Sequence, residues 1–449
     1  MGNIIDHLPL ELPLISDTII IKVIGVGGGG GNAVNHMYRQ GITDVSFVVC
    51  NTDNQALIKS PVPIKIQLGS NTTEGLGAGG NPEVAKKAAE ESLSKIQAMF
   101  QDSTKMVFIT AGMGGGTGTG ASPVVAKVAH DMGILTVGIV TIPFAFEGNL
   151  KIRQALEGVA ALSEHVDAIL VINNEKLKDI YPDLELSNAF AKADDVLTNA
   201  AKAIAEIITI PGYINTDFAD VYSIMKDGNV AIMNTGCASG EHRISKAIEN
   251  ALNSPLLNTN DVSGASKILL SLYCSTSNQI RMDEVEEIHH FMGKVGTDVQ
   301  VIWGATFDDE LGDDVKITLI ATGFEVGDIP GMPSKIAKQH KDRQNERKNA
   351  EEAENIPPSR PTKVETRGET TGRPNKEEEI KKAIGSFYGE KIKRTTTIGK
   401  EIEENVFTEE NNEMAERDLP TITLSDLDND DKLDDLEKTP AWKRKLHRK

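Results

Sequence analysis

Two glycine-rich segments have the residue types and spacing to bind phosphate. The first starts at Gly25 and contains Gly27, Gly28, Gly29, Gly30, Gly31 and Asn32; the second contains Gly114, Gly115, Gly116, Thr117, Gly118, Thr119 and Gly120. Each follows a short β-branched run and precedes a helical pattern. Glycine lets the backbone approach a phosphate closely, and the first turn of the next helix offers unpaired N–H groups. Both segments are therefore predicted to bind phosphate.

The first segment alone leaves the ligand open. Gly25, Gly27 and Gly30 satisfy the G-x-G-x-x-G pattern of dinucleotide-binding folds, so an NAD-dependent oxidoreductase is one alternative. A second strand–loop–helix phosphate segment favours a triphosphate ligand, bound from several sides, over a dinucleotide. The sequence has no G-x-x-x-x-G-K-[ST], which argues against a P-loop NTPase. A third glycine segment precedes a helix and could join the same pocket; it contains Ala78, Gly79 and Gly80.

The elements that must position these segments alternate between strand and helix. Strands are predicted at 18–24, 45–50, 106–110, 135–140 and 168–172, separated by helices at 33–40, 82–100, 123–131 and 150–164. This order predicts a Rossmann-like α/β fold, with a parallel sheet covered by helices on both faces. A long central helix is predicted over 187–211. A second, smaller α/β unit follows it, with strands near 267–273, 299–303 and 316–322.

Length and charge narrow the class further. The chain has 449 residues, enough for two domains, and its net charge of −19 argues against nucleic acid as a partner. Three widely spaced cysteines suggest neither a disulfide framework nor a metal site, so a reducing cytoplasm is expected. We recognise no signal peptide and no transmembrane segment in the sequence. Residues 1–16 are predicted to be a flexible extension, 326–435 a disordered linker, and 436–449 a basic partner-binding peptide.

Five motifs occur together in an order that resembles the tubulin/FtsZ family of GTPases. They are Gly27–Gly31, Asn51–Asp53, Gly114–Gly120, Pro143–Gly148 and Asn215–Asp220. The resemblance covers about residues 17–325. It implies a GTP-binding domain over 17–186, a central helix over 187–211 and a GTPase-activation domain over 212–325. It also implies a protein that hydrolyses GTP and polymerises head-to-tail into filaments.

The resemblance assigns nucleotide contacts residue by residue. Both glycine segments and Ala78–Gly80 correspond to phosphate-binding positions, and Glu147 and Lys151 to positions that hold ribose and phosphate. The base would be bound by Asn174, by Phe190 stacked on guanine, and by Asp195 accepting its N1 and N2 protons. From the residues alone, Phe190 could equally be a core residue and Asp195 a solvated charge. The expected ligands are GTP or GDP with Mg²⁺, or a monovalent cation as an alternative, and no metal site made by protein residues.

Asp217 and Asp220, with Asn215 beside them, resemble the catalytic loop that one subunit inserts into the nucleotide pocket of the next. The carboxylates would orient the attacking water. As residues alone, two carboxylates three positions apart could also be an N-cap pair for the following helix. A filament former that binds GTP without hydrolysing it is a further alternative, which the presence of both carboxylates disfavours.

The implied partners are other copies of the chain and division proteins. The resemblance implies filaments that form the cytokinetic Z ring at midcell, in the cytoplasm on the inner face of the membrane. Peptide 436–449 would bind membrane-tethering adaptors of the FtsA type and assembly regulators. The sequence departs from the family pattern at Asp194, where asparagine is common, at Thr216, where valine is common, and in the basic, Trp442-bearing tail. That tail leaves anionic lipid as an alternative ligand.

Overall fold

The structure is a computed structural model. It describes residues 19–181, 183, 185–252, 264–295, 299–329, 332–334, 337–338, 340–342, 344, 421–422 and 445–446. The predicted extension 1–16 lies outside the described residues, and so do most of the predicted linker and tail. The chain divides into two units, residues 1–387 and 388–449. In the second unit, Thr421–Ile422 (β11) pairs in parallel with Lys445–Leu446 (β12).

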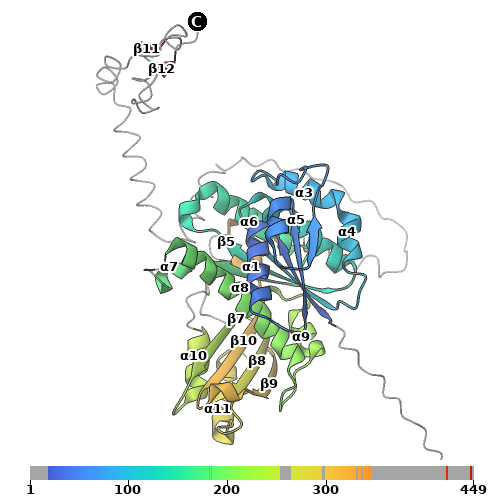
Figure 1. The fold of residues 1–449 in the computed structure, drawn as a ribbon. Helices are drawn as coiled ribbons and strands as arrows, with labels where there is room; N and C mark the ends of the chain where they lie inside the picture. The colour runs from blue at the N-terminus through green and yellow to red at the C-terminus, as the bar shows by residue number, and fades with distance from the viewer. Residues whose placement is uncertain are drawn as a thin grey trace, which may run out of the picture. The chain divides into compact units, whose positions relative to one another are not determined.

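Helices and strands alternate through most of the first unit (Figure 1). The helices are α1 Gly27–Arg39, α2 Asn54–Lys59, α3 Pro82–Glu91, α4 Leu93–Ala98, α5 Gly116–Asp131, α6 Asn149–Ser163, α7 Lys176–Ile180, α8 Leu186–Thr209, α9 Phe218–Met225, α10 Arg243–Leu252 and α11 Met282–Val295, with 3-10 turns η1 Ala145–Glu147, η2 Asp309–Leu311 and η3 Val326–Asp328. The strands are β1 Ile21–Val26, β2 Val45–Asn51, β3 Ile64–Gln67, β4 Met106–Gly112, β5 Leu135–Ile142, β6 Ala168–Asn173, β7 Asn229–Ala238, β8 Lys267–Cys274, β9 Gln300–Phe307 and β10 Val315–Phe324.

The strands form one continuous sheet in the order β3-β2-β1-β4-β5-β6-β7-β10-β8-β9. From β3 to β7 every pairing is parallel, whereas β10 runs antiparallel to both of its neighbours, β7 and β8. The predicted parallel sheet is confirmed. The two predicted α/β units are joined through the short β6–β7 pairing, in which Ala168 lies opposite Asn229.

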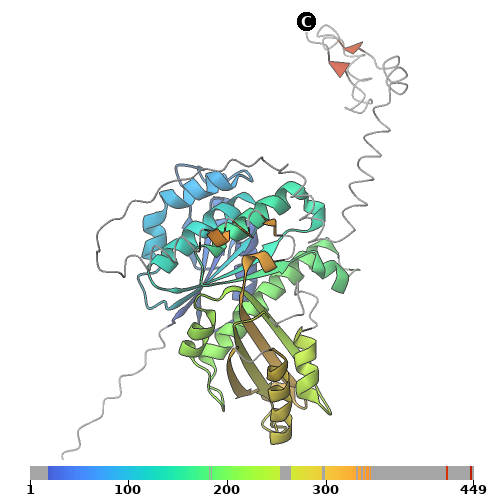
Figure 2. The same ribbon diagram turned by 180° about the vertical axis from the view of Figure 1, so that it is seen from behind.

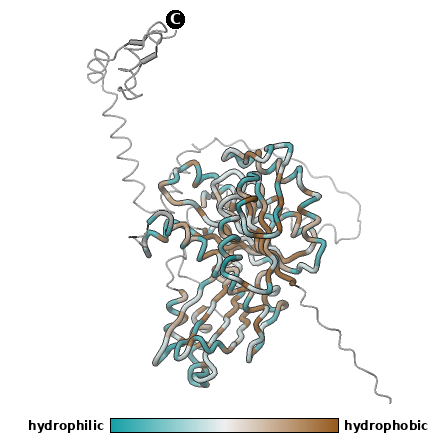
Figure 3. Tube along the Cα trace, in the orientation of Figure 1, coloured by the Kyte–Doolittle hydropathy of each residue, from teal (hydrophilic) through white to brown (hydrophobic). Residues whose placement is uncertain are grey.

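Helices cover both faces of the parallel part, as two views half a turn apart show (Figures 1 and 2). Buried side chains of α1, α8 and α9 pack with Val137 and Ile139 of β5 in one hydrophobic core. Gly138, between them, faces the other side, where a Cβ would touch Leu162 of α6. The strands at the centre are the most hydrophobic part of the fold (Figure 3). The hydrophobic core therefore packs α8 against this face of the sheet.

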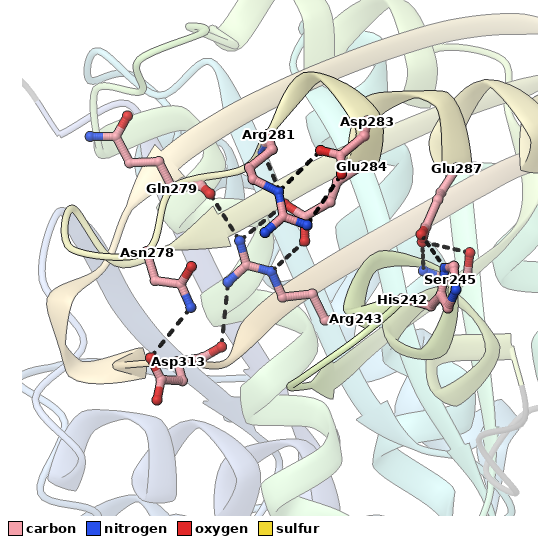
Figure 4. Close-up of polar contacts among 10 residues, drawn as sticks. All are labelled: His242, Arg243, Ser245, Asn278, Gln279, Arg281, Asp283, Glu284, Glu287 and Asp313. Atoms are coloured by element: carbon pink, nitrogen blue, oxygen red, sulfur yellow. Dashed lines mark hydrogen bonds and ion pairs between the residues drawn. The ribbon is translucent and has the colours of Figure 1, made fainter.

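The second half of the sheet is held by a buried ion pair (Figure 4). Arg243, at the start of α10, donates from Nε to Glu284 Oε1 at 2.7 Å and from Nη2 to Glu284 Oε2 at 3.1 Å. Its remaining bonds go to the carbonyl oxygens of Gln279 and Asp313. The two side chains are only 4% and 7% exposed. This Arg243–Glu284 cluster joins α10, α11 and two loops.

Several boundaries differ from the sequence prediction. α1 and α5 begin within the glycine segments, at Gly27 and Gly116, so the second helix starts seven residues before the predicted Pro123. The helix predicted over 82–100 is broken at Ser92, whose hydroxyl accepts a hydrogen bond from the Gly69 amide. Strands β3 and β7 were not predicted. β3 has only four residues, and β7 carries asparagine, threonine and glycine between its apolar positions.

Packing also continues past the predicted domain end at residue 325. Ile329 and Met332 are buried, and the His340 imidazole lies 3.0 Å from the Ser163 hydroxyl at the end of α6. These contacts join residues far apart in the sequence, so composition alone could not reveal them. No helix in the described part of the chain is long and apolar enough to cross a membrane.

Candidate functional site

A cavity of about 240 Å³ lies where the carboxyl ends of the central strands meet α1 and the start of α8. Six of the described residues lining it were not predicted from sequence to bind nucleotide: Gly112, Met113, Thr141, Pro143, Ala193 and Leu197. A seventh, Asp194, was noted only as a departure from the family pattern. The predicted ligand-binding residues that line it are Gly29, Asn32, Gly114, Gly115, Glu147, Lys151, Asn174 and Phe190. Residues predicted from three separate motifs are thus brought to one cavity.

Three helices next to this cavity begin without a side-chain cap. The first turns of α1, α5 and α6 have no capping hydrogen bond and no acidic residue. By contrast, α2 is capped by Asp53 and α3 by Asn81. The uncapped helix starts leave N–H groups without intrahelical partners beside the cavity. Such groups can bind an anion such as a phosphate.

The glycines of the two segments have different structural roles. Gly29, Gly114 and Gly115 line the cavity, while Gly28 and Gly31 face open space. The others allow close packing. A Cβ on Gly27 would lie 2.7 Å from the Gly118 nitrogen, one on Gly30 would lie 2.1 Å from Thr110 O, one on Gly118 would lie 2.4 Å from Gly112 O, and one on Gly120 would lie 2.0 Å from Pro82 O. In each segment, some glycines therefore let two backbone segments pack closely, and others line the cavity where a ligand can reach the backbone.

The remaining predicted phosphate residues do not line this cavity. The Thr117 hydroxyl lies 2.7 Å from that of Thr52, and the Thr119 hydroxyl accepts a hydrogen bond from the Gly114 amide. Ala78, Gly79 and Gly80 form a turn against Gly116, where a Cβ would come within 3.0 Å of Ala78 and Gly80. Ala78 and Gly80 thus pack against the second glycine segment.

One wall of the cavity has the groups needed to bind a planar base. Phe190 is 41% exposed, so it is not a core residue, and its ring meets Phe144 edge-on at 5.3 Å. Asn174 is buried, yet its Oδ1 has no hydrogen-bond partner among the residues that the structure describes. A buried acceptor without a partner is costly unless a ligand donates to it. The Phe190 face and the Asn174 oxygen are thus available to a ligand.

The structure places Asp194, and not its predicted neighbour Asp195, among the described residues that line the cavity. Asp194 lines the cavity, and burial raises its pKa to about 6, with Asp195 adding to the shift and His36 opposing it. Asp195 is not among the described residues that line the cavity. Its carboxylate binds His36 Nε2 at 2.8 Å and Lys192 Nζ at 2.9 Å. Asp194 is thus the carboxylate of the pair that lines the cavity, while the carboxylate of Asp195 is bound by His36 and Lys192.

Glu147 and Lys151 lie together at the mouth of the cavity. Glu147 Oε1 accepts a hydrogen bond from the Phe144 amide, and Oε2 lies 3.4 Å from Lys151 Nζ. The lysine is half exposed, so its ammonium can move toward a phosphate. No group of three or more His, Cys, Asp or Glu side chains in the described residues could hold a metal ion.

The predicted catalytic loop lies at the other end of α8. Asp217 caps α9: its carboxylate accepts hydrogen bonds from the Ala219 and Asp220 amides, and Asp220 accepts one from the Asp217 amide. The N-cap alternative is therefore observed, and Asp217 remains exposed. The Asn215 side chain accepts a hydrogen bond from the Gly212 amide. Asp194 and Thr209 are fifteen positions apart on α8, so the cavity and the start of this loop are about 22 Å apart along the helix.

Residues 20–182 match the family model for the GTPase domain of the tubulin/FtsZ family, and residues 229–325 match the model for the FtsZ C-terminal domain. The cell division protein FtsZ of Porphyromonas gingivalis is 53% identical over 343 residues, which are 74% of this chain and 75% of that relative. This chain belongs to the FtsZ family. The resemblance found in the sequence is confirmed.

Other FtsZ proteins are similar over the same part of the chain. FtsZ of Wigglesworthia glossinidia brevipalpis is 44% identical over 326 residues, 72% of this chain and 83% of that protein. A solved FtsZ dimer from M. jannaschii has a TM-score of 0.62 and 42% identity, covering 68% of this chain and 88% of that one. CetZ2 of Haloferax volcanii, 18% identical with a TM-score of 0.59, shares the fold. The chain is thus an FtsZ-family cell division protein whose GTPase domain binds guanine nucleotide, which excludes the dinucleotide alternative.

One residue that lines the cavity, Asp194, was not among the residues predicted to bind nucleotide. Asp194 is a departure from the family pattern, and nothing in the local sequence separates it from Asp195. Thr141 and Gly112 could have been found, because Gly112 ends β4 and Thr141 is the next-to-last residue of β5, at the edge where ligands bind in parallel sheets.

Proposed function

We propose that this protein hydrolyses GTP at a site shared between two copies of the chain. The observation that carries the proposal is the separation along α8. The cavity lies near its first turns, and Asp217, Asp220 and Asn215 follow its last turn, about 22 Å away. One chain alone therefore cannot place these carboxylates on a nucleotide in its own cavity. A second copy stacked head-to-tail can bring its loop there.

Guanine binds between Phe190, Asn174 and Asp194 in this proposal. An ionised carboxylate can accept both the N1 and N2 protons of guanine, which adenine does not offer. The earlier assignment of this role to Asp195 is replaced by Asp194, because Asp195 is engaged by His36 and Lys192. The buried, unpartnered Asn174 oxygen supplies a further acceptor.

The phosphates bind at the uncapped starts of α1 and α5, with Lys151 near them. Mg²⁺ is expected to enter with GTP, because it binds substrate phosphates and keeps several of its waters; a monovalent cation is the alternative companion. The exposed Asp217 and the half-buried Asp220 of the adjacent subunit would orient the attacking water and accept its proton. The existing cap bonds fix these carboxylates to backbone N–H groups, which preorganises them for this task.

Apolar side chains exposed at both ends support the head-to-tail contact. Phe146 and Leu150 adjoin Glu147 and Lys151 in the sequence, and Tyr213 near the catalytic loop is 76% exposed and packs on Phe307. Two different surfaces that meet in this way form a heterologous contact, which continues into a filament instead of closing.

The filaments would form the Z ring at midcell, in the cytoplasm on the inner face of the membrane. Peptide 436–449 would tether them through adaptors of the FtsA type and would also bind assembly regulators. Deleting 436–449 should leave GTP turnover and filaments in solution intact while abolishing recruitment to the division site. Continued localisation of the truncated protein would remove this part of the proposal.

The test of the shared site is GTP turnover per subunit against protein concentration, with pelleting measured alongside. Turnover should rise from near zero above a critical concentration, together with the pelleted fraction. Constant turnover per subunit down to high dilution would contradict the proposal. Pelleting without phosphate release would instead favour the filament former that binds GTP without hydrolysing it.

A further inference from the structure

Helix α9 is short and has the proposed catalytic carboxylates at its first turn. It spans eight residues, about 12 Å, and begins directly after Asp217. A helix of this length moves as one piece. Whatever holds its last turn therefore sets the position of Asp217 and Asp220 at the other end.

The last turn of α9 is held by two side chains from neighbouring strands. Lys267 Nζ donates to the carbonyl oxygens of Ser223 and Lys226, both at 2.8 Å. The Thr322 hydroxyl donates to the carbonyl oxygen of Ile224 at 2.9 Å. Lys267 begins β8 and lies directly opposite Thr322 of β10 in the sheet register. The cross-strand pair thus binds three carbonyls that a helix end leaves without partners, and the lysine charge suits the negative end of the helix dipole.

Lys226, the residue directly after α9, links the end of this helix to the GTPase domain. Lys226 Nζ donates to Asp167 Oδ1 at 2.6 Å, and the side chain of Asp167 is fully buried in the loop before β6. Asp167 Oδ2 accepts a hydrogen bond from the Thr136 amide of β5. The end of α9 is therefore the point at which both halves of the sheet hold the catalytic helix.

The segment that leads into α9 is attached less firmly. Ile214 and Ala305 of the edge strand β9 exchange two backbone hydrogen bonds of 3.0 Å. Gly304 has no side chain, and a Cβ there would lie 2.7 Å from Thr216 Cγ2. This bridge and the packing of Phe218 against the core hold the start of α9, and the polar contacts at its far end restrain its tilt.

We propose that Lys267 and Thr322 are positioning residues for GTP hydrolysis, which hold α9 so that Asp217 and Asp220 meet the nucleotide of the neighbouring subunit. The inference rests on the proposed function. The apolar face of α9, with Val221, Ile224 and Met225 buried in the core, stays in place without them. Loss of the two side chains should therefore loosen the tilt of α9 while leaving it folded.

Lys267→Met and Thr322→Val test the inference directly. The expected result is a loss of phosphate release per pelleted subunit of about tenfold or more for Lys267→Met, and less for Thr322→Val, because small misplacement of a catalytic group costs rate steeply. GTP affinity and the pelleted fraction should stay as in the parent. Thr322→Ser, which keeps the hydroxyl, should retain turnover.

Lys316→Met is the matched control. Lys316 lies on β10, but its ammonium contacts the Tyr273 ring and Asp308 instead of α9, so turnover should not change. Parental turnover in Lys267→Met and Thr322→Val would overturn the inference. So would a loss of turnover that merely follows loss of pelleting or of thermal stability.

Asp217→Asn, measured in the same assay, separates this inference from the proposed function. If Asp217→Asn hydrolyses GTP at the parental rate per pelleted subunit, the proposed function fails. If Asp217→Asn is inactive while Lys267→Met keeps the parental rate, only the positioning role fails.

Discussion

The Arg243–Glu284 cluster and the wall of the nucleotide cavity both contain buried polar groups, but they differ in how those groups are satisfied. Each nitrogen of the Arg243 guanidinium has a partner within the cluster. On the cavity wall, Asn174 Oδ1 has no partner, and burial raises the pKa of Asp194. Buried polar groups that are fully hydrogen-bonded stabilise the fold, whereas an unsatisfied acceptor beside a cavity can accept a hydrogen bond from a ligand. The contrast predicts opposite consequences when each region is mutated.

The largest effect is expected from Arg243→Met. Removing the guanidinium leaves Glu284 buried without its ion-pair partner, which should lower the free energy of unfolding by about 3–5 kcal/mol. Urea denaturation measures this change. In Arg243→Met/Glu284→Leu no unpaired charge remains, so most of the loss should be recovered. A single variant as stable as the parent would show that the cluster does not support the fold.

Asp194→Asn should affect the ligand instead of the fold. Loss of a charged acceptor for guanine should weaken GTP binding by about 1–3 kcal/mol, or roughly 5- to 150-fold in Kd, and reduce discrimination against ATP. Asp195→Asn is the matched comparison, because it loses the His36 and Lys192 contacts and should mainly lower stability. Nucleotide binding by titration calorimetry distinguishes them. A larger loss of affinity in Asp195→Asn would return the base-binding role to that residue.

Asn174→Ala tests the same contrast between ligand binding and fold stability at one atom, the Asn174 Oδ1. GTP affinity should fall by about 1 kcal/mol, the value of one neutral hydrogen bond. The nucleotide-free protein should keep its unfolding free energy, because the Oδ1 atom has no partner to lose. A variant that loses more stability than affinity would make Asn174 part of the fold, like Arg243.

A further effect is a pH dependence of the nucleotide-free protein. Burial raises the pKa of Asp194 from its ordinary 3.8 to about 6, so the folded state holds this proton more tightly than the unfolded state. Above pH 6 the folded protein therefore carries the cost of an ionised, partly buried carboxylate, and that cost disappears as the pH falls from 6 toward 4. The parent should gain stability relative to Asp194→Asn across this window. An equal difference at pH 7 and pH 4 would contradict the raised pKa.

Local patterns predicted most of the fold and the position of the site. β-branched runs located the central strands, and the two glycine segments located one side of the cavity, because both signals depend on neighbouring residues only. The N-cap at Asp217 is also local, since its bonds reach only to Ala219 and Asp220.

The sequence could not reveal features set by distant contacts. Which of Asp194 and Asp195 faces the ligand depends on the rotation of α8, which its packing against α1 and the sheet determines. Gly30 packs against Thr110, and Arg243 pairs with Glu284 41 positions away. A glycine that binds phosphate and one that permits packing look the same until the neighbouring backbone is known.

The central claim is that a cavity from one subunit and a loop from another complete one site. The most direct measurement mixes two variants. Asp217→Asn has an altered loop and an intact cavity, and Asp194→Asn has an altered cavity and an intact loop. GTP is supplied at a concentration that fills the first cavity and leaves the second largely empty. The account predicts that neither variant alone releases phosphate and that the mixture does, because Asp217 of the second variant reaches GTP bound to the first. A mixture that pellets together and releases no more phosphate than the two variants measured separately would contradict the account.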